Sequence, residues 1–464
     1  MLRHAPALLA LVSFQAFAQP LTPAETAQID EIVTRTLAAN GVPSAEVAVV
    51  RDGKIVLNKA YGKANENLPA NPDLPYQIAS NSKQFTAMAL LLLQDEGKLS
   101  LDDHVSKYLP GITEGDKISI RQLLSHTSGI QDFWPQDYSF EAMSHPTTPQ
   151  GIVDRWAKKP LDFQPGDQWQ YSNTGYVVAG MIAEKVSGEP LLKYLQRKIF
   201  KPLGMSSVRD QDETNTPAFP APYTRHALGP IRSEIPPAHG WLFAAGELSM
   251  TAADLAKWDI ARIDRAAIPA DDWQAQETEV KLNNGEGTGY GLGVSVRSTP
   301  RRAVTHTGEA VGFLSVNTVY PDDHAAVVVL TNSWNTGSAY TQIAREIAQL
   351  ILPPVQAQDP VVAAQAARAR TVYDELRGGT LNRALLTQNA NYYFTPQTIA
   401  DFQSSLAPLG EPVSFEPEGK PVLRGGFVIQ GYTIKYPTRT LSLSTFYEPG
   451  ANGRIEQFLV SPAS

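Results

Sequence analysis

Residues 80–98 read SNSKQFTAMALLLLQDEGK, and this stretch predicts a helix in the interior of the protein. Apolar side chains between Phe85 and Leu93 fall on nearly every face of such a helix. A helix without a polar face belongs in a core rather than on a surface. Gly97 fits its C-terminal cap. The helix therefore begins, at Ser80, beside a water-poor interior.

The first four residues, Ser80-Asn81-Ser82-Lys83, form an S-x-x-K pattern. Residues three positions apart share a helix face, so Lys83 can reach the Ser80 hydroxyl. Serine is a poor nucleophile until a base takes its proton, and burial lowers the pKa of lysine toward the range in which it is such a base. Free backbone N–H groups at a helix start suit a developing oxyanion. Alone, the pattern also fits an ordinary solvated helix start.

Two later tripeptides offer matching chemistry. Tyr171-Ser172-Asn173 lies within FQPGDQWQYSNTGY, where a tyrosine hydroxyl can relay a proton and an asparagine amide can hold a substrate carbonyl. His306-Thr307-Gly308 ends a strand-like run, where Thr307 offers a hydroxyl and Gly308 permits close approach of a substrate backbone. Taken singly, each also fits a plain turn or strand end.

The pattern around these motifs predicts an α+β domain over residues 22–352, with an antiparallel sheet and a helical insertion. Asp52-Gly53 between two apolar runs is typical of a hairpin turn. Strands are expected at 45–50, 54–60, 290–296, 303–306, 314–319 and 325–330, and helices at 23–39 and 339–351.

The tail predicts a second unit. Residues 353–362 (PPVQAQDPVV) are typical of a linker. Residues 363–464 then predict a small α+β domain, with helices at 363–376 and 395–406 followed by four strands between Val413 and Leu459. The order of these elements resembles the NTF2-like fold.

The N-terminus predicts export. Residues 1–18 (MLRHAPALLALVSFQAFA) combine a short basic start, an apolar stretch and an A-x-A cleavage site at Ala18, as in a secretory signal peptide. The alternative is a buried N-terminal helix. We expect a periplasmic or secreted protein without a membrane span, because no later apolar run is long enough to provide one.

Composition excludes several other classes. The 464 residues carry a net charge of -8 without a basic stripe, so no nucleic-acid partner is expected. The absence of cysteine rules out disulfides and thiolate chemistry. The eight histidines are scattered and form no H-E-x-x-H, so we predict no metal and no cofactor. Zinc hydrolysis is the alternative that this argument opposes.

The three motifs, in this order and spacing, resemble the fingerprint of the serine β-lactamase and penicillin-binding-protein superfamily. The likeness is greatest to its class C-like branch and covers residues 24–352. Three further stretches also resemble that branch: Leu123-Leu124-Ser125-His126-Thr127-Ser128-Gly129, Lys201-Pro202-Leu203-Gly204-Met205 and Tyr290-Gly291-Leu292-Gly293.

The resemblance implies a β-lactamase/transpeptidase-like fold and a role for each motif residue. Ser80 would form the acyl-enzyme, with Lys83 and Tyr171 as acid and base. The backbone N–H groups of Ser80 and Glu309 would form the oxyanion hole. The residues expected to contact the substrate are Asn173, His306, Thr307 and Gly308.

Two positions depart from the common pattern. His306 stands where many β-lactamases have lysine, a variant shared with some peptidases and esterases. Glu309 replaces a small residue and would bring a carboxylate near the acid end of a substrate. Of Arg301 and Arg302, at most one should reach the groove to offset it, because they point to opposite faces of a strand.

His126 offers a base for a Ser-His-Asp triad, although its LLSHTSG context favours a structural role. The absence of G-x-S-x-G gives no support to an α/β-hydrolase.

We expect an exported serine hydrolase acting on amide or ester bonds in D-residue peptides, small esters or β-lactams. The alternative is a non-hydrolytic, penicillin-recognising protein that acylates and stalls. A third possibility places a ligand-binding or dimerisation role in the tail. The sequence assigns neither the physiological substrate nor an oligomeric state.

Overall fold

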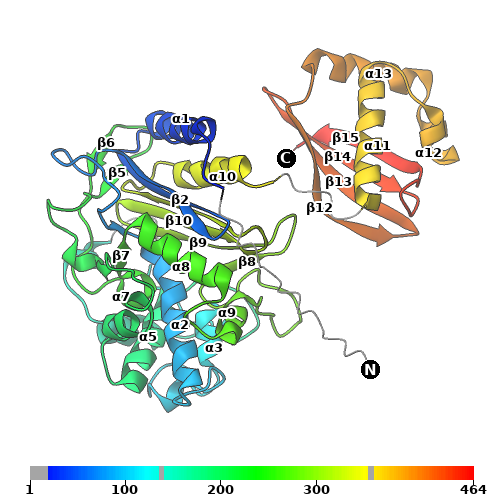
Figure 1. Ribbon diagram of the computed structural model, residues 1–464. Coiled ribbons are helices and arrows are strands. Elements are labelled where there is room, and N and C mark those ends of the chain that lie inside the picture. Colours follow the sequence, from blue (N-terminus) through cyan, green and yellow to red (C-terminus); the bar gives the residue numbers. More distant parts are fainter. Residues whose placement is uncertain (1–18, 135–139, 354–359, 464) are drawn as a thin grey trace, which may run out of the picture. The chain divides into compact units, whose positions relative to one another are not determined.

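The computed structural model describes residues 19–134, 140–353 and 360–463, so the predicted signal peptide lies outside the described residues. The chain divides into two compact units at Pro353 (Figure 1). Each unit has its own hydrophobic core. In the described ranges, no helix has both the length and the apolar character that crossing a bilayer requires.

The first unit is built on a six-stranded antiparallel sheet with the order β2-β1-β11-β10-β9-β8. Both ends of the unit contribute strands, as the sequence predicts, because β1 pairs with β2 on one side and with β11 on the other. The strands are β1 (Ser44–Arg51), β2 (Lys54–Gly62), β8 (Ser295–Arg297), β9 (Ala303–Ala310), β10 (Phe313–Tyr320) and β11 (Ala325–Thr331).

Helices cover both faces of this sheet (Figure 1). α1 (Pro23–Asn40) and α10 (Ala339–Ile351) pack on one face, against Val47 and Val329. The helical insertion packs on the other face, against Ala48 and Val328. Because successive side chains of a strand point to opposite faces, the central strands β1 and β11 are apolar at nearly every position.

The insertion surrounds α2 (Lys83–Asp95), ten of whose residues are buried. The sequence suggests that Ser80 begins this α-helix, but the α-helix begins at Lys83. Ser80 lies in η1 (Ala79–Ser82), a 3-10 turn that directly precedes α2. The other helices of the insertion are α3 (Ile120–Leu124), α4 (Pro149–Ile152), α5 (Asn173–Ser187), α6 (Leu191–Leu195), α7 (Phe243–Gly246), α8 (Ala252–Asp264) and α9 (Ala270–Glu277). Its short strands are β3 (Tyr76–Gln77), β4 (Arg209–Asp210), β5 (Tyr223–Arg225), β6 (Ile231–Ser233) and β7 (Leu248–Met250).

Two late strands differ from prediction. The strand expected over 290–296 is reduced to β8, because Gly293 adopts a positive φ of 77° and turns the chain before it. β9 runs to Ala310, so His306-Thr307-Gly308 lies inside a strand rather than at its end. The additional residues of β9 pair with β10 as far as Phe313.

The second unit is the α+β arrangement that the sequence predicts, with the sheet order β12-β13-β14-β15. Its elements are α11 (Pro360–Arg377), α12 (Gln388–Tyr393), α13 (Pro396–Leu406), β12 (Ser414–Arg424), β13 (Phe427–Lys435), β14 (Thr440–Tyr447) and β15 (Ile455–Pro462). α11 takes up the last three residues of the predicted linker 353–362, and α12 was not predicted. The NTF2-like likeness stays a prediction.

Candidate active site

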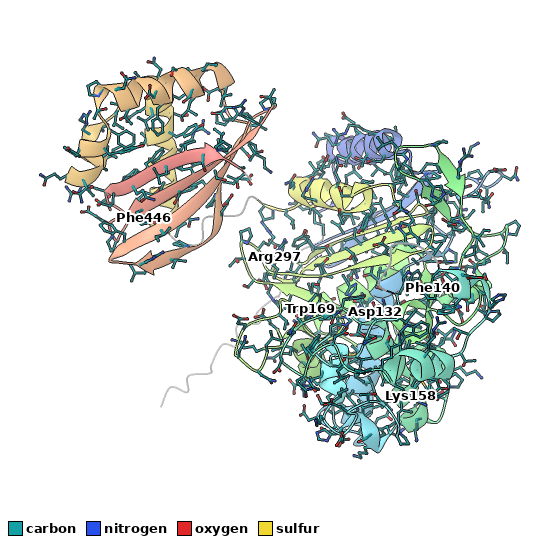
Figure 2. The ribbon with its side chains drawn as sticks, turned by 180° about the vertical axis from the view of Figure 1, so that it is seen from behind. Asp132, Phe140, Lys158, Trp169, Arg297 and Phe446 are labelled. Atoms are coloured by element: carbon teal, nitrogen blue, oxygen red, sulfur yellow. The ribbon has the colours of Figure 1, made fainter. Side chains whose placement is uncertain are left out.

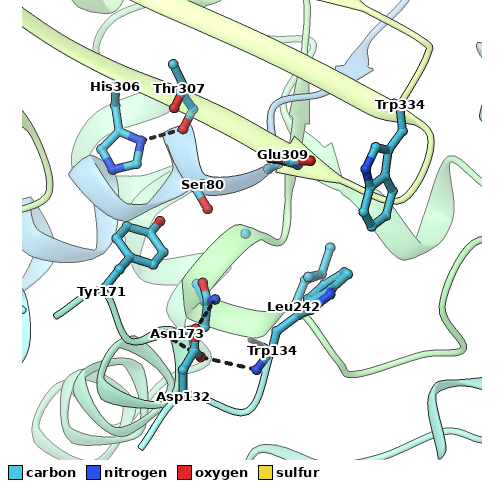
Figure 3. Close-up of a pocket in the computed structure, with 13 residues that line it drawn as sticks. Ser80, Asp132, Trp134, Tyr171, Asn173, Leu242, His306, Thr307, Glu309 and Trp334 are labelled. Atoms are coloured by element: carbon cyan, nitrogen blue, oxygen red, sulfur yellow. Dashed lines mark hydrogen bonds between the residues drawn. The ribbon is translucent and has the colours of Figure 1, made fainter. Parts of the chain in front are cut away.

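A cavity of about 220 Å³ opens in the first unit where η1, the start of α5 and β9 meet (Figure 3). The sequence predicted six of its lining residues as site residues, which are Ser80, Tyr171, Asn173, His306, Thr307 and Glu309. Lys83 lies behind them and is fully buried. The lining residues that the sequence did not indicate include Asp132, Trp134, Leu242 and Trp334.

The turn that carries Ser80 is held by its neighbours. The Asn81 side chain donates a 2.9 Å hydrogen bond to the Ser315 hydroxyl, and the Ser82 hydroxyl accepts one of 3.1 Å from the Leu248 backbone N–H. Ala79 adopts a positive φ of 49°, a conformation that costs free energy in a residue other than glycine. The surrounding contacts therefore fix a strained turn that leaves Ser80 half-exposed in the cavity.

Lys83 makes three hydrogen bonds from its side-chain nitrogen. Nζ lies 2.9 Å from Ser80 Oγ, 2.7 Å from Asn173 Oδ1 and 2.7 Å from the Ala245 carbonyl oxygen. Burial lowers the pKa of Lys83 to about 7, against the opposing effect of the Asp132 charge. At neutral pH a large fraction of Lys83 is therefore uncharged, with a lone pair that can accept a proton from Ser80.

Tyr171 lies on the other side of the Ser80 hydroxyl from β9 (Figure 3). Burial raises the pKa of Tyr171 above its ordinary value, and a hydrogen bond with Ser80 lowers it by less. The Lys83 nitrogen lies 4.8 Å from the centre of the Tyr171 ring. Tyr171 is therefore a neutral phenol at physiological pH, suited to relaying a proton rather than to acting as a phenolate base.

Asp132 orients Asn173, a role that no sequence pattern indicated. Its carboxylate accepts hydrogen bonds from the Asn173 backbone N–H at 2.9 Å and from Asn173 Nδ2 at 3.1 Å. The second bond turns the amide so that Oδ1 faces Lys83. Burial raises the pKa of Asp132, and these hydrogen bonds oppose that effect. The sequence feature that could have drawn attention to Asp132 is its position just after the SHTSG stretch, residues 125–129.

β9 forms the edge of the cavity that lies across Ser80 from Tyr171 (Figure 3). β8 pairs with β9 only at Ala303–Thr305, so the following residues of β9 leave one edge open toward Ser80. Thr307 and Glu309 are exposed and line the cavity. Such an open edge leaves alternate backbone groups available to a ligand.

Gly308 is absent from the cavity lining, and its contact with the substrate stays a prediction. A Cβ added there would lie 2.1 Å from the Ile78 carbonyl oxygen and 2.2 Å from Ser315 Oγ. The missing side chain therefore allows β9 to approach the chain leading into η1.

His306 is neutral and fixed by two hydrogen bonds. Its Nδ1 lies 2.5 Å from the Thr307 carbonyl oxygen, which can only accept, so Nδ1 carries the proton. Nε2 then accepts from the Tyr290 hydroxyl at 2.8 Å. Burial lowers the pKa of His306 to about 3, with the Lys83 charge as the next cause. His306 therefore supplies no positive charge for a substrate carboxylate.

Neither arginine before β9 offsets Glu309. Arg301 pairs with Asp323 and also donates to the Pro353 carbonyl oxygen. Arg302 pairs with Glu277 at 2.6 Å and with Asp322 at 3.0 Å. Both guanidinium groups are thus engaged by groups outside the cavity lining.

His126 supports the site from behind. Its Nδ1 accepts a 3.1 Å hydrogen bond from the Ser172 backbone N–H, and its ring lies 4.2 Å from that of Tyr171, centre to centre. Burial lowers its pKa well below the ordinary value. These contacts position the Tyr171-Ser172-Asn173 turn. In the described ranges, no group of three or more His, Asp or Glu side chains is arranged to hold a metal.

Comparison with known proteins identifies a family for residues 29–351. The family model described as Beta-lactamase matches residues 29–351. Penicillin-binding protein 4* of Bacillus subtilis (strain 168) is 29% identical over 324 residues, which are 66% of this chain and 71% of that protein.

Two solved structures have folds similar to that of this chain. The octameric penicillin-binding protein homologue from Pyrococcus abyssi is similar with a TM-score of 0.62 at 22% identity, covering 95% of this chain and 96% of that chain, a likeness of fold alone. The D-stereospecific amidohydrolase from Streptomyces sp. has a TM-score of 0.58 at 29% identity, covering 69% of this chain and 97% of that chain.

Proposed function

The chain belongs to the β-lactamase family and is a serine hydrolase, and from that premise we propose that it is exported and cleaves amide or ester bonds through an acyl-enzyme on Ser80. The observation that carries the proposal is the contact of the Ser80 hydroxyl with a buried Lys83 whose pKa lies near 7. The sequence of residues 1–18 supports export.

In the acylation step, uncharged Lys83 takes the Ser80 proton, directly or through the Tyr171 hydroxyl. Ser80 Oγ attacks the substrate carbonyl carbon, and the resulting oxyanion is held by the backbone N–H groups of Ser80 and Glu309. The proton then passes to the leaving amine or alcohol as its bond to the carbonyl carbon breaks. Water repeats the sequence on the ester of Ser80 and frees the acid.

Asn173 and Thr307 support this chemistry from opposite sides of Ser80. The Asn173 amide, fixed by Asp132, holds both Lys83 and the substrate. The Thr307 hydroxyl stands on the open edge of β9 and binds the far side of the scissile group. His306 and His126 position residues rather than transfer protons, because burial lowers the pKa of both imidazoles and makes them weak bases.

The proposed substrates are esters and amides without a carboxylate, including amides of D-amino acids, rather than acids. This preference is supported by the Glu309 carboxylate in the lining, by the neutral His306, and by the engagement of Arg301 and Arg302 elsewhere. The similarity to a D-stereospecific amidohydrolase and to a penicillin-binding protein suggests comparing amides of D-amino acids with penicillins.

A substrate panel tests the proposal. The purified protein is assayed against p-nitrophenyl acetate, D-alanine amide, a D-alanyl-D-alanine peptide and a fluorescent penicillin. We expect turnover of the ester or the amide by the wild type and none by Ser80→Ala. A stable penicillin adduct on Ser80 without turnover of any compound would instead identify a protein that acylates and stalls.

A further inference from the structure

The cavity around Ser80 lies where two parts of the first unit meet. Figure 2 shows Asp132 and Trp169 at the boundary between the six-stranded sheet and the helical insertion. Ser80 belongs to η1, which leads into the insertion, whereas Glu309 belongs to β9 of the sheet. Neither element by itself sets the distance between these two residues, so this distance depends on the contacts that tie η1 to the sheet.

Ser315 of β10 makes such a contact. Its side chain is fully buried, and its hydroxyl donates a 2.7 Å hydrogen bond to the Ile78 carbonyl oxygen. Ser315 Oγ also accepts a 2.9 Å hydrogen bond from Asn81 Nδ2. Because Ile78 precedes η1 and Asn81 follows Ser80, one hydroxyl holds the chain on both sides of Ser80.

Ser315 also adjoins β9. It is the partner of Gly308 in the ladder between β10 and β9, and Gly308 directly precedes Glu309. A Cβ added at Gly308 would lie 2.2 Å from Ser315 Oγ and 2.1 Å from the Ile78 carbonyl oxygen. β9 therefore lies directly against the hydrogen bond between Ser315 and Ile78, and this bond sets how far η1 stands from β9.

The turn at Ser80 needs such a restraint. Ala79, between Ile78 and Ser80, has a positive φ of 49°. A residue other than glycine keeps this conformation only where the surrounding contacts over-determine it. The Ser315 hydroxyl supplies two of these contacts, so its removal should allow the turn to relax away from β9.

We propose that Ser315 is a positioning residue that holds the backbone N–H groups of Ser80 and Glu309 at the separation an oxyanion requires. Such donors act from about 2.7–3.1 Å, so a small displacement of η1 weakens the transition state more than the bound substrate. Ser315 is fully buried and absent from the cavity lining, and it therefore acts through the backbone. This inference rests on the proposed function and adds to it the residue that sets the oxyanion geometry.

The test compares an oxygen ester with its sulfur analogue. p-Nitrophenyl acetate and p-nitrophenyl thionoacetate share a leaving group and differ only in the carbonyl oxygen or sulfur. The thioanion is larger and accepts weaker hydrogen bonds, so it gains less from two fixed N–H donors. The quantity measured is the ratio of the two kcat/KM values, oxygen over sulfur, divided by the same ratio for alkaline hydrolysis. Both substrates meet the same protein sample, so a partly unfolded variant leaves this normalised ratio unaffected.

Ser315→Ala should lower the normalised ratio about tenfold. A misplacement of about 1 Å can cost about a hundredfold in rate, and the turn is expected to relax by less. The pH at which the ester activity rises should stay near 7, because Lys83 keeps its hydrogen bonds to Asn173 and Ala245.

Two further variants separate positioning from general stability. Asn81→Ala should lower the normalised ratio by less, because Ser315 still holds Ile78. Thr331→Val is the matched control, since it removes another buried hydroxyl of the same sheet, one that donates to the Leu314 carbonyl oxygen at 3.0 Å. It should lower the melting temperature and leave the normalised ratio as in the wild type.

Three results would overturn the inference: a normalised ratio in Ser315→Ala equal to that of the wild type, an equal fall in Thr331→Val, or a wild-type value no greater than one. A merely structural Ser315 gives the first result, with a lower melting temperature alone. Absence of acetate activity in the wild type, or its survival in Ser80→Ala, would instead refute the proposed function itself.

Discussion

Lys83 Nζ and Ser80 Oγ lie 2.9 Å apart, one turn from each other along the chain, and the lysine side chain is fully buried. Three acceptors surround Nζ, which suits the three N–H groups of an ammonium ion. Burial nevertheless lowers the pKa to about 7. The two effects together allow Lys83 to gain and lose a proton near neutral pH.

The first prediction is a pH profile that follows Lys83. The uncharged lysine is the base, so kcat/KM for a neutral ester should rise with pH through about 7 and level off above it. His306 should add no step, because burial lowers its pKa to about 3. The measurement is kcat/KM for p-nitrophenyl acetate from pH 5 to 9. A flat profile over that range would contradict the role of Lys83.

Asp132 should influence this profile from a distance. Its negative charge raises the pKa of Lys83, so Asp132→Asn should move the rising limb to lower pH. The variant also loses an acceptor for the Asn173 amide, and kcat should fall about 10- to 100-fold through misplacement.

The same ester assay on Asp132→Asn checks both effects, with Asp116→Asn, an exposed acid, as the control. If kcat falls while the limb stays in place, Asp132 acts through packing alone and its charge does not reach Lys83.

Removing the charge of Glu309 should improve acidic substrates. At about 6 Å and an effective dielectric constant of about 20, two like charges repel by roughly 3 kcal/mol, about a hundredfold in affinity. Salt screening reduces this effect. Glu309→Gln should therefore raise kcat/KM for a penicillin or a D-alanyl-D-alanine peptide, relative to a neutral ester, by about tenfold or more. An unchanged ratio would mean that the carboxylate points away from the bound acid.

The second unit should be dispensable for chemistry. Among the described residues, the buried clusters of the first unit end at Ile351, and the buried cluster of the second unit begins at Ala369. A chain ending at Gln356 should stay soluble and keep its ester kcat/KM within about twofold, because separate cores fold separately. An insoluble or inert truncated protein would show that the tail belongs to the active unit.

Local patterns predicted the elements that depend on short spacing. The three-residue step from Ser80 to Lys83 places both side chains on one face of a turn, and the nearly continuous apolar runs of β1 and β11 mark buried strands. The 3-10 turn at Ser80 was not predictable, because Asn81 and Ser82 are fixed by Ser315 and Leu248, far along the chain.

The residues that sequence reasoning missed act through long-range proximity. Asp132 matters because it meets Asn173, 41 positions later, and Trp134 faces Trp334 across 200 residues. Neither belongs to a local repeat or spacing that could mark it. For Gly308 the residue was noticed, but the sequence did not indicate the close approach to Ile78 that its missing side chain permits.

The acyl-enzyme on Ser80 is the central claim, and trapping it is the most direct test. Neither η1 nor α2 uses the Ser80 side chain as a cap, so Ser80→Ala should fold normally. The protein is mixed briefly with p-nitrophenyl acetate, quenched in acid, and analysed by intact-mass and peptide mass spectrometry. We predict one added acetyl group on the peptide that contains Ser80, and neither adduct nor turnover in Ser80→Ala. An acetyl group on any other residue of the wild type, or turnover retained by the variant, would contradict the account.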